Sequence, residues 1–176
     1  MPTIFTHVAV PVAAALALGS RRVPPSMLLV GALAAIAPDF DGIPYQFGSA
    51  GSGIWAHRGI THTALFALLM GLLGLGLARW WKVPRLAGFA WVFFCTLSHP
   101  LLDMMTSGGS GIALLWPLSS ERFFSPWRPI AVSPIAADRF FSQRGVQVLV
   151  SELYNVWFPL LTLGLSIFAL RHTRKS

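Results

Sequence analysis

The sequence predicts an all-α, polytopic membrane helix bundle of about five helices. Hydrophobic residues make up 55% of its 176 residues and charged residues only 11%, and the mean hydropathy is +0.65. Its apolar stretches are longer than the core of a soluble domain requires. A chain of this length can hold roughly four to six spanning helices and no separate soluble domain. We therefore expect one integral membrane domain over residues 1–176.

Apolar periodicity places the five helices at residues 4–19, 25–38, 63–81, 85–105 and 146–170. The first two are short for a hydrocarbon span, so we expect them to tilt, to thin the bilayer locally or to pack inside the bundle. The first stretch lacks a basic start and is followed by Arg21 and Arg22, which indicates a retained span and not a secretory signal. Cys95 has no partner, so we expect a buried thiol.

The basic residues predict how the bundle is oriented. Two short turns, around Arg21 and around Lys82, and the C-terminal tail hold eight of the 13 Lys and Arg residues, and the two longer loops hold the other five. Cytoplasmic flanks of spanning helices are enriched in Lys and Arg. Five spans then place the N-terminus outside, the C-terminus in the cytoplasm and the loops 39–62 and 106–145 outside. This topology explains the net charge of +7 without a nucleic-acid partner.

Histidines and aspartates gather at the outer ends of these helices. Four of the five His and three of the four Asp occur there. Ionisable groups at such positions are costly and tend to be functional. Because the topology brings these ends to one membrane face, we expect a metal site at the outer face. Its candidate residues are His7, Asp39, Asp41, His57, His62, His99 and Asp103.

Two pairs within this set have a spacing that suits metal binding. His99 and Asp103 are four residues apart, which places an imidazole and a carboxylate on one helical face. A helix-end hydrogen bond between them is the alternative. Asp39 and Asp41 are two residues apart, so in an extended segment both carboxylates face the same way and repel each other unless a cation or proton intervenes. A helix-terminal turn is the alternative for either aspartate.

The loop before the third helix reads His-Arg-Gly-Ile-Thr-His over residues 57–62. Thr61 is expected to cap the helix, which leaves N-terminal amides for an anion. Arg58 is expected to pair with a phosphate oxygen. His57 and His62 are expected to join the metal site, because two other His and Asp clusters reach the same membrane face.

Two further ionisable residues are weaker candidates. His7 opens the first span and has a simple interfacial position as its alternative. Glu152 lies six residues into the last predicted span, near the outer face, and is a possible additional ligand. It can equally form a buried hydrogen-bonded pair with Asn155, three residues on.

This donor set predicts the kind of metal. Neutral imidazoles with carboxylates suit a divalent transition metal, zinc first, with manganese or iron as alternatives, better than magnesium. Six or seven candidate ligands exceed the needs of one tetrahedral ion, which favours two ions. Such ions activate water and stabilise the oxygens of a phosphoryl group.

Four motifs carry a resemblance to a known family: Pro-Asp-x-Asp, His-Arg-Gly-x-Thr-His, Ser-His-x-x-x-Asp-x-x-Thr and Leu-Leu-Trp-Pro. They occur in this order at Pro38–Asp41, His57–His62, Ser98–Thr106 and Leu114–Pro117. Together they resemble the YdjM family of inner-membrane proteins, which are predicted metal-dependent hydrolases, over about residues 5–118. The resemblance implies a membrane-bound hydrolase. The order of His and Asp residues is also distantly similar to bacterial zinc phospholipase C, whose later His-x-x-x-Glu pair is absent here unless Glu152 replaces part of it.

The second long loop mixes aromatic residues with Arg122 and Arg128. Aromatic side chains prefer the membrane interface, and arginines there can bind lipid phosphates. We expect this loop to contact membrane lipids and the substrate, and an ordinary interfacial loop is the alternative.

These observations predict a metal-dependent hydrolase of the bacterial cytoplasmic (inner) membrane that cleaves a phosphoester of a lipid or lipid-linked substrate. Asp41, His57 and Arg58 are the expected catalytic residues beside the metal ligands. The alternative is a non-enzymatic metal-binding protein, either a transporter or a structural or regulatory partner. A transporter needs polar residues through its spans, yet residues 64–78 are apolar or glycine. The sequence leaves the oligomeric state open.

Overall fold

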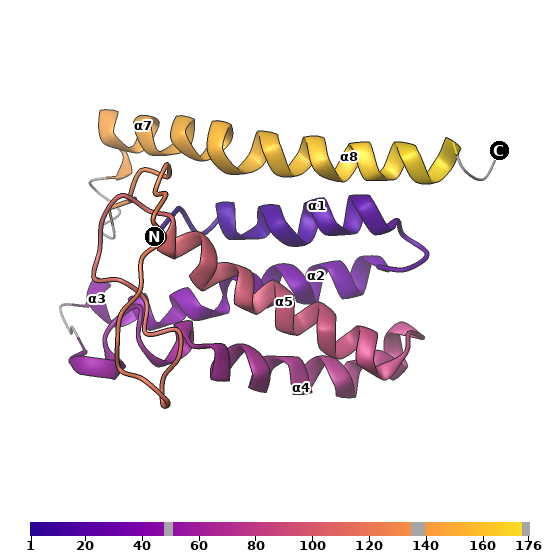
Figure 1. Cartoon of the computed structure of the whole chain (residues 1–176), viewed down its shortest axis with the longest axis horizontal. Helices are drawn as coiled ribbons and strands as arrows, with labels where there is room; N and C mark the ends of the chain where they lie inside the picture. The colour runs from indigo at the N-terminus through magenta and orange to yellow at the C-terminus, as the bar shows by residue number, and fades with distance from the viewer. Residues whose placement is uncertain (48–50, 135–139, 174–176) are drawn as a thin grey trace.

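The computed structural model describes residues 1–47, 51–134 and 140–173. Helices lie side by side along the long axis of the molecule (Figure 1). Within these ranges there is no β-strand, only two isolated bridges between loop residues. The predicted all-α bundle is confirmed. The main helices are α1 (Ala9–Leu18), α2 (Pro25–Ile36), α4 (Ala64–Trp81), α5 (Arg85–Met104), α7 (Gln143–Glu152) and α8 (Phe158–Thr173).

Three helical stretches are long and apolar enough to cross a membrane, namely Ala64–Trp81, Arg85–Met104 and Gln143–Thr173. The first apolar helix is shorter: a 3₁₀ turn, η1 (Thr6–Val8), leads into α1, so that Thr6–Leu18 forms one stretch. The second also ends early, at Ile36, where a 3₁₀ helix, η2 (Ala37–Gly42), replaces the α-helix. Pro38 has no N–H to continue the α-helical hydrogen bonds, which explains the change.

The helices pack through small residues and one buried tryptophan. Helix α4 packs along α5, α1 against α8, and α2 against α5. A Cβ atom on Gly74 of α4 would lie 2.3 Å from the carbonyl oxygen of Gly88 in α5, so these backbones touch. Trp91 of α5 donates a 2.7 Å hydrogen bond from Nε1 to the carbonyl of Met27 in α2, and both residues belong to the core.

The last helix is continuous but irregular. Ser142 caps α7, and a π-helical turn, η5 (Leu153–Trp157), joins α7 to α8. Such turns occur at functional sites more often than elsewhere in helices. Here the turn directly follows the buried carboxylate of Glu152.

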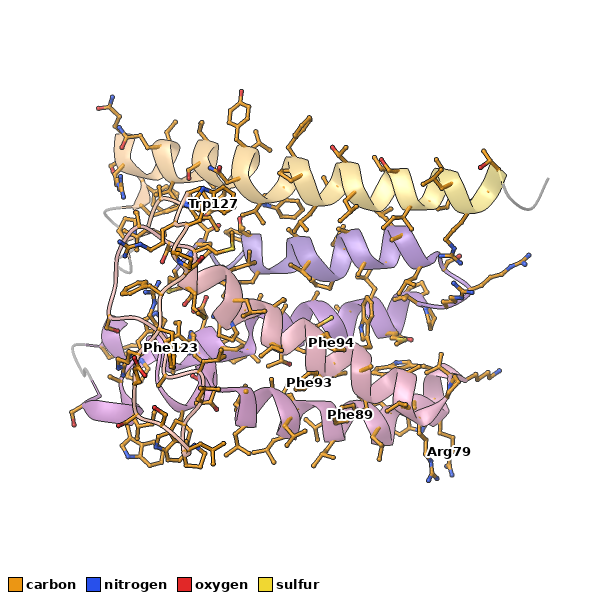
Figure 2. The ribbon with its side chains drawn as sticks, viewed as in Figure 1. Arg79, Phe89, Phe93, Phe94, Phe123 and Trp127 are labelled. Carbon is orange, nitrogen blue, oxygen red and sulfur yellow. The ribbon has the colours of Figure 1, made fainter. Side chains whose placement is uncertain are left out.

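The bundle has two chemically different ends (Figure 1). At one end, which we call the basic end, lie the α1–α2 turn, the α4–α5 turn and the end of α8, with Arg79 nearby (Figure 2). At the other, the loop end, lie the N-terminus, the 3₁₀ segments and the loops after α5, which carry Phe123 and Trp127 (Figure 2). The candidate metal ligands belong to segments of the loop end. Which end faces the cytoplasm stays a prediction.

Candidate metal centre

Four segments bring the predicted ligands together at the loop end. η1 supplies His7, η2 supplies Asp39, the segment up to η4 (Ile60–His62) supplies two histidines, and the last turns of α5 supply His99 and Asp103. Six side chains form two groups in which ligand atoms lie within 4.8 Å of one another. All six are buried. The groups, which we call together the His–Asp cluster, are His7, His99 and Asp103, and Asp39, His57 and His62.

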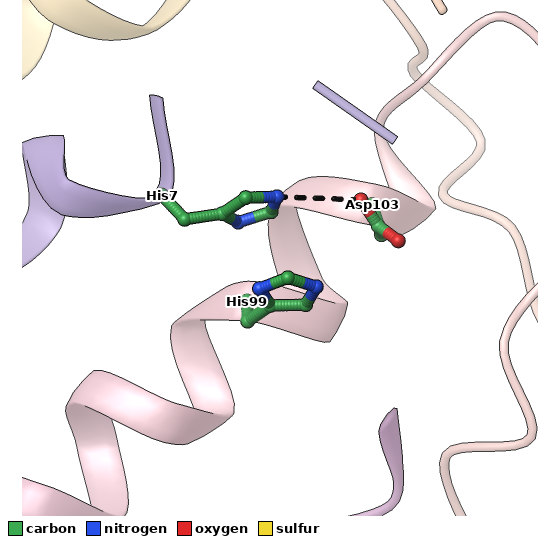
Figure 3. A group of neighbouring side chains, drawn as sticks. All are labelled: His7, His99 and Asp103. Atoms are coloured by element: carbon green, nitrogen blue, oxygen red, sulfur yellow. Dashed lines mark ion pairs between the residues drawn. The ribbon is translucent and has the colours of Figure 1, made fainter. Parts of the chain in front are cut away.

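The first group is built on α5. His99 and Asp103 share one helical face, as their spacing predicts, and His7 reaches them from η1 (Figure 3). The imidazole of His7 stacks on that of His99 with ring centroids 3.6 Å apart. Its Nε2 lies 3.7 Å from Oδ1 of Asp103. This ring packing positions His7 at the carboxylate.

Short distances join the two groups. Nε2 of His62 lies 3.1 Å from Nε2 of His99, and Nε2 of His99 lies 3.3 Å from Oδ1 of Asp39. Oδ2 of Asp103 lies 3.5 Å from Nε2 of His62. Two nitrogens bound to one tetrahedral zinc ion at 2.0–2.1 Å are separated by about 3.3 Å. The spacing in the His–Asp cluster therefore fits metal coordination.

Hydrogen bonds fix the protons of these two imidazoles. Nδ1 of His99 lies 2.7 Å from the carbonyl oxygen of Ala35, which can only accept, so Nδ1 carries the proton. Nδ1 of His62 lies 3.2 Å from Oδ2 of Asp41 and donates to it. In the neutral rings both Nε2 atoms then hold lone pairs that face each other. A proton or a metal cation between them removes this repulsion.

Two buried polar atoms of the cluster favour a cation. Nε2 of His7 and Oδ1 of Asp103 have no hydrogen-bond partner within the described part of the chain, and they lie 3.7 Å apart. Unsatisfied buried groups of this kind are rare and call for an explanation. A divalent ion would satisfy them together, so these residues fit a metal.

The pKa shifts of Asp39 and His62 agree with this arrangement. Burial raises the pKa of Asp39, but the neighbouring His99 and His7 outweigh burial, and the net pKa is lowered. Burial lowers the pKa of His62, but hydrogen bonds with Asp103 and Asp41 outweigh it and raise the pKa to about 9. Without a metal, a proton therefore takes the place of the cation on His62 at neutral pH.

Asp41 lies behind two histidines, away from the centre of the cluster. Its Oδ1 is 2.6 Å from Nδ1 of His57, and its Oδ2 accepts a 2.6 Å hydrogen bond from Thr61 as well as the contact with His62. Burial raises the pKa of Asp41, and these hydrogen bonds lower it further than burial raises it. The prediction that Asp39 and Asp41 face the same way is wrong, because η2 turns about once every three residues.

The cap of α4 also differs from the prediction. The hydroxyl of Thr63, and not that of Thr61, accepts the hydrogen bond from the backbone N–H of Phe66. A 3₁₀ turn, η4, separates Thr61 from the helix. Thr61 instead donates to Asp41.

Arg58 turns inward and away from the solvent. It has a positive φ of 67° and a side chain that is 2% exposed. Its Nη1 donates to the carbonyl of Gly108, its Nη2 donates to Thr106, and its Nε lies 3.3 Å from Oδ2 of Asp103. Each of the three guanidinium nitrogens therefore has a partner in the chain, and the group anchors the segment after α5 to Asp103. The expected pairing of Arg58 with a phosphate oxygen stays a prediction.

The two loop arginines lie outside the His–Asp cluster. Arg122 donates to the carbonyls of Arg58, Gly111 and Gly53 and so ties the two long loops together. Arg128 is exposed, with its guanidinium carbon 4.8 Å from the ring centre of Phe124. Arg128 therefore remains available to lipid phosphates.

Glu152 does not belong to either metal-binding group. Its carboxylate accepts hydrogen bonds from the backbone and hydroxyl of Thr3 and from the hydroxyl of Thr6. Asn155 donates to the carbonyls of Ser151 and Pro129, so the expected Glu152–Asn155 pair is absent. Glu152 thus fixes the segment that leads to His7. The two threonines could not be predicted from the sequence as partners of Glu152, because they lie about 150 positions away along the chain.

A cavity of about 390 Å³ opens beside the His–Asp cluster. Asp39 and His57 contribute its polar wall. The other side chains that line it are mainly apolar, among them Phe5, Ile43 and Phe140. The cluster therefore adjoins a space suited to an apolar or amphipathic molecule.

Comparisons with known proteins agree with this architecture. The model of the YdjM inner membrane protein family matches residues 1–174. The inner membrane protein YbcI of Escherichia coli (strain K12) is 42% identical over 160 residues, which cover 90% of this chain and 92% of YbcI. No solved structure matches the chain.

Proposed function

This chain belongs to the YdjM family of inner membrane proteins, and we propose that it is a metal-dependent hydrolase acting on a phosphoester of a lipid or lipid-linked substrate. The family and the apolar helices make it a multi-pass inner membrane protein. One observation carries the metal proposal. Nε2 of His62 and Nε2 of His99 face each other at 3.1 Å, while both rings donate from Nδ1.

The chain supplies more than enough donors for a metal ion. Imidazoles and carboxylates suit zinc first, and manganese or iron binds the same donors. A bound ion of this kind lowers the pKa of water and stabilises charge on phosphoryl oxygens. We assign as ligands His62, His99, Asp39 and Asp103, with His7 as a further ligand beside Asp103. His57 lies at the cavity and is not one of these ligands.

His57 and Asp41 are suited to move a proton at the cavity. Nδ1 of His57 donates to Asp41 over 2.6 Å, which leaves Nε2 as the basic atom of the neutral ring. In our proposal Nε2 accepts a proton from water and returns it to the leaving group, and Asp41 stabilises the charged imidazole between these steps. Arg58 acts indirectly, by holding Asp103.

The surroundings of the site support a lipid phosphoester as substrate. The adjoining cavity has apolar walls around the polar wall of Asp39 and His57. A lipid presents an apolar chain next to a phosphate, so its chain would contact the apolar walls while its phosphate lies near Asp39 and His57. Arg128 and the aromatic loop residues are placed to contact neighbouring lipids. The charge bias of the turns supports a cytoplasmic basic end and a loop end outside.

Metal analysis of detergent-purified protein, followed by a hydrolysis screen, tests the proposal. We expect at least one transition metal ion per chain and release of phosphate or a phosphorylated headgroup from at least one lipid of a panel containing phosphatidic acid, phosphatidylglycerol and an isoprenoid pyrophosphate. Asp103→Asn should lose both metal and activity. Glu121→Gln, at an exposed loop carboxylate, is the matched control and should lose neither.

Two results would overturn the proposal. Folded protein purified without metal that also fails to bind zinc would remove the metal centre. Metal-loaded protein that hydrolyses no member of the panel, or Asp103→Asn with full activity, would remove the hydrolase and favour a structural or transport role for the metal.

A further inference from the structure

The basic end holds a second cavity system, far along the bundle from the metal centre. A groove of about 660 Å³ runs between α1, α2 and α5. Its walls are apolar and include Val10, Met27 and Phe94. Three basic residues also line it where the two turns meet, namely Arg21, Arg22 and Lys82. The groove therefore combines an apolar wall with a basic rim.

A second cavity of about 410 Å³ adjoins this rim. It shares Leu18, Arg21 and Arg22 with the groove and adds Arg171 and His172 from the end of α8. Nη1 of Arg171 donates to the carbonyl of Ala17, which holds α8 against the end of α1. The two cavities thus meet at one pair of arginines.

The charge of this rim is not balanced within the described residues. The side chains of Arg21, Arg22 and Lys82 are exposed, and none of the ion pairs or side-chain hydrogen bonds found in residues 1–47, 51–134 and 140–173 involves them. The described carboxylates, in contrast, all belong to loop-end segments. Among the described residues, an anion placed between these three cations meets no nearby negative group.

We propose that this groove binds an anionic phospholipid of the surrounding bilayer. One acyl chain lies against Val10, Met27 and Phe94, and the phosphate lies between Arg21, Arg22 and Lys82. Basic pockets between membrane helices on the cytoplasmic side bind anionic headgroups by the same physics. The groove volume lies within the range of small-molecule sites. An amphipathic anion fits both parts of the groove, whereas a soluble protein partner would leave the apolar wall, which lies along the helices, uncovered.

Lipid binding to the full chain in detergent tests this proposal, with phosphatidylglycerol as the probe and phosphatidylcholine as the neutral comparison. Native mass spectrometry measures the bound lipid, and thermal unfolding measures its effect. We expect Arg21→Gln combined with Arg22→Gln to weaken phosphatidylglycerol binding about 25-fold, from roughly fivefold per arginine. The control combines Arg79→Gln with Arg85→Gln and removes the same charge from the same end of the bundle. These two arginines line neither cavity, so phosphatidylglycerol binding should change by less than about threefold.

A second variant tests the apolar part of the groove. Ala90→Phe fills the groove without changing charge and should reduce phosphatidylglycerol binding at least about tenfold, while Leu86→Phe, at a position 73% exposed and outside the groove, should not. Equal loss in the two double-arginine variants would overturn the proposal in favour of general attraction to anionic membranes. Equal binding of both lipids, or full binding to Ala90→Phe, would also overturn it. Metal content should stay unchanged throughout, so this proposal can fail independently of the hydrolase.

Discussion

Replacing Asp41 by asparagine tests whether this carboxylate orients the neighbouring histidines or binds the metal itself. Oδ1 of Asp41 accepts from His57, and Oδ2 accepts from Thr61 and His62. In Asp41→Asn one oxygen becomes an amide that can only donate. Whichever way the amide turns, at least one histidine faces a donor. That ring can keep a favourable contact only by moving its proton to Nε2. At His62 this removes the lone pair directed at the metal, and at His57 it removes the proton acceptor at the cavity.

The expected loss follows from the role of such partners. Carboxylates that hydrogen-bond metal-binding histidines typically contribute about 10- to 100-fold in metal affinity, or about 1.4–2.8 kcal/mol. We therefore expect Asp41→Asn to bind zinc about 10- to 100-fold more weakly, measured by competition with a chromophoric chelator in detergent. Thr61→Val is the matched control, since it removes one hydrogen bond to the same carboxylate and leaves both histidines paired. Its loss should be about fivefold or less.

Two outcomes would refute this reasoning. Unchanged zinc affinity in Asp41→Asn would show that the histidines need no carboxylate to orient them. Complete loss of metal, equal to that in Asp103→Asn, would make Asp41 a ligand, as the sequence predicts.

Three further predictions concern the proton, the packing and the buried arginine. Because zinc must displace a proton from His62, whose pKa is raised to about 9, apparent zinc affinity should rise up to roughly tenfold per pH unit from 6.5 to about 9; a flat profile contradicts this. Gly74→Ala should destabilise the bundle by about 1–3 kcal/mol in chemical unfolding, because its Cβ would meet the Gly88 carbonyl, whereas Gly76→Ala, with open space around it, should be neutral or stabilising. Arg58→Lys keeps the charge but loses the two hydrogen bonds that Nη1 and Nη2 donate, so the free energy of unfolding should fall by about 1–3 kcal/mol. An unchanged free energy of unfolding would show that these hydrogen bonds are dispensable.

Hydropathy was sufficient to predict the bundle, because each apolar stretch must satisfy its backbone inside one helix. The boundaries of α4 and α5 lie within one residue of the predicted ranges 63–81 and 85–105. Predictions were less accurate where local chemistry competes with the helix. The 25–38 stretch changes to 3₁₀ geometry around Pro38, and the last helix starts earlier, at Gln143, because Ser142 caps it.

The convergence of His and Asp residues could also be predicted, because it depends only on which helix end carries each residue and on the opposite directions of consecutive spans. Their individual directions could not. The inward turn of Arg58 depends on a positive φ and on partners near position 106, about 50 residues away. The contact of Glu152 with Thr3 joins the two ends of the chain. Long-range partners of this kind leave no periodic signal in one sequence.

The two short helices, which look inadequate as spans, give the metal centre its depth. At 1.5 Å per residue, the 13 residues of Thr6–Leu18 extend about 20 Å from the basic end, and the 12 residues of α2 extend about 18 Å. On α5, His99 lies 14 residues from Arg85, or about 21 Å along the helix. His7, Asp39 and His99 therefore meet at one level, short of the roughly 30 Å of a hydrocarbon core. Full-length spans would carry His7 and Asp39 past His99 to the interface. With the basic end at one face of the hydrocarbon core, as the charge bias predicts, the proposed centre would lie below the opposite face. Such a position would favour a substrate that enters from the lipid, which is the physical reason for proposing a lipid phosphoester and not a water-soluble one.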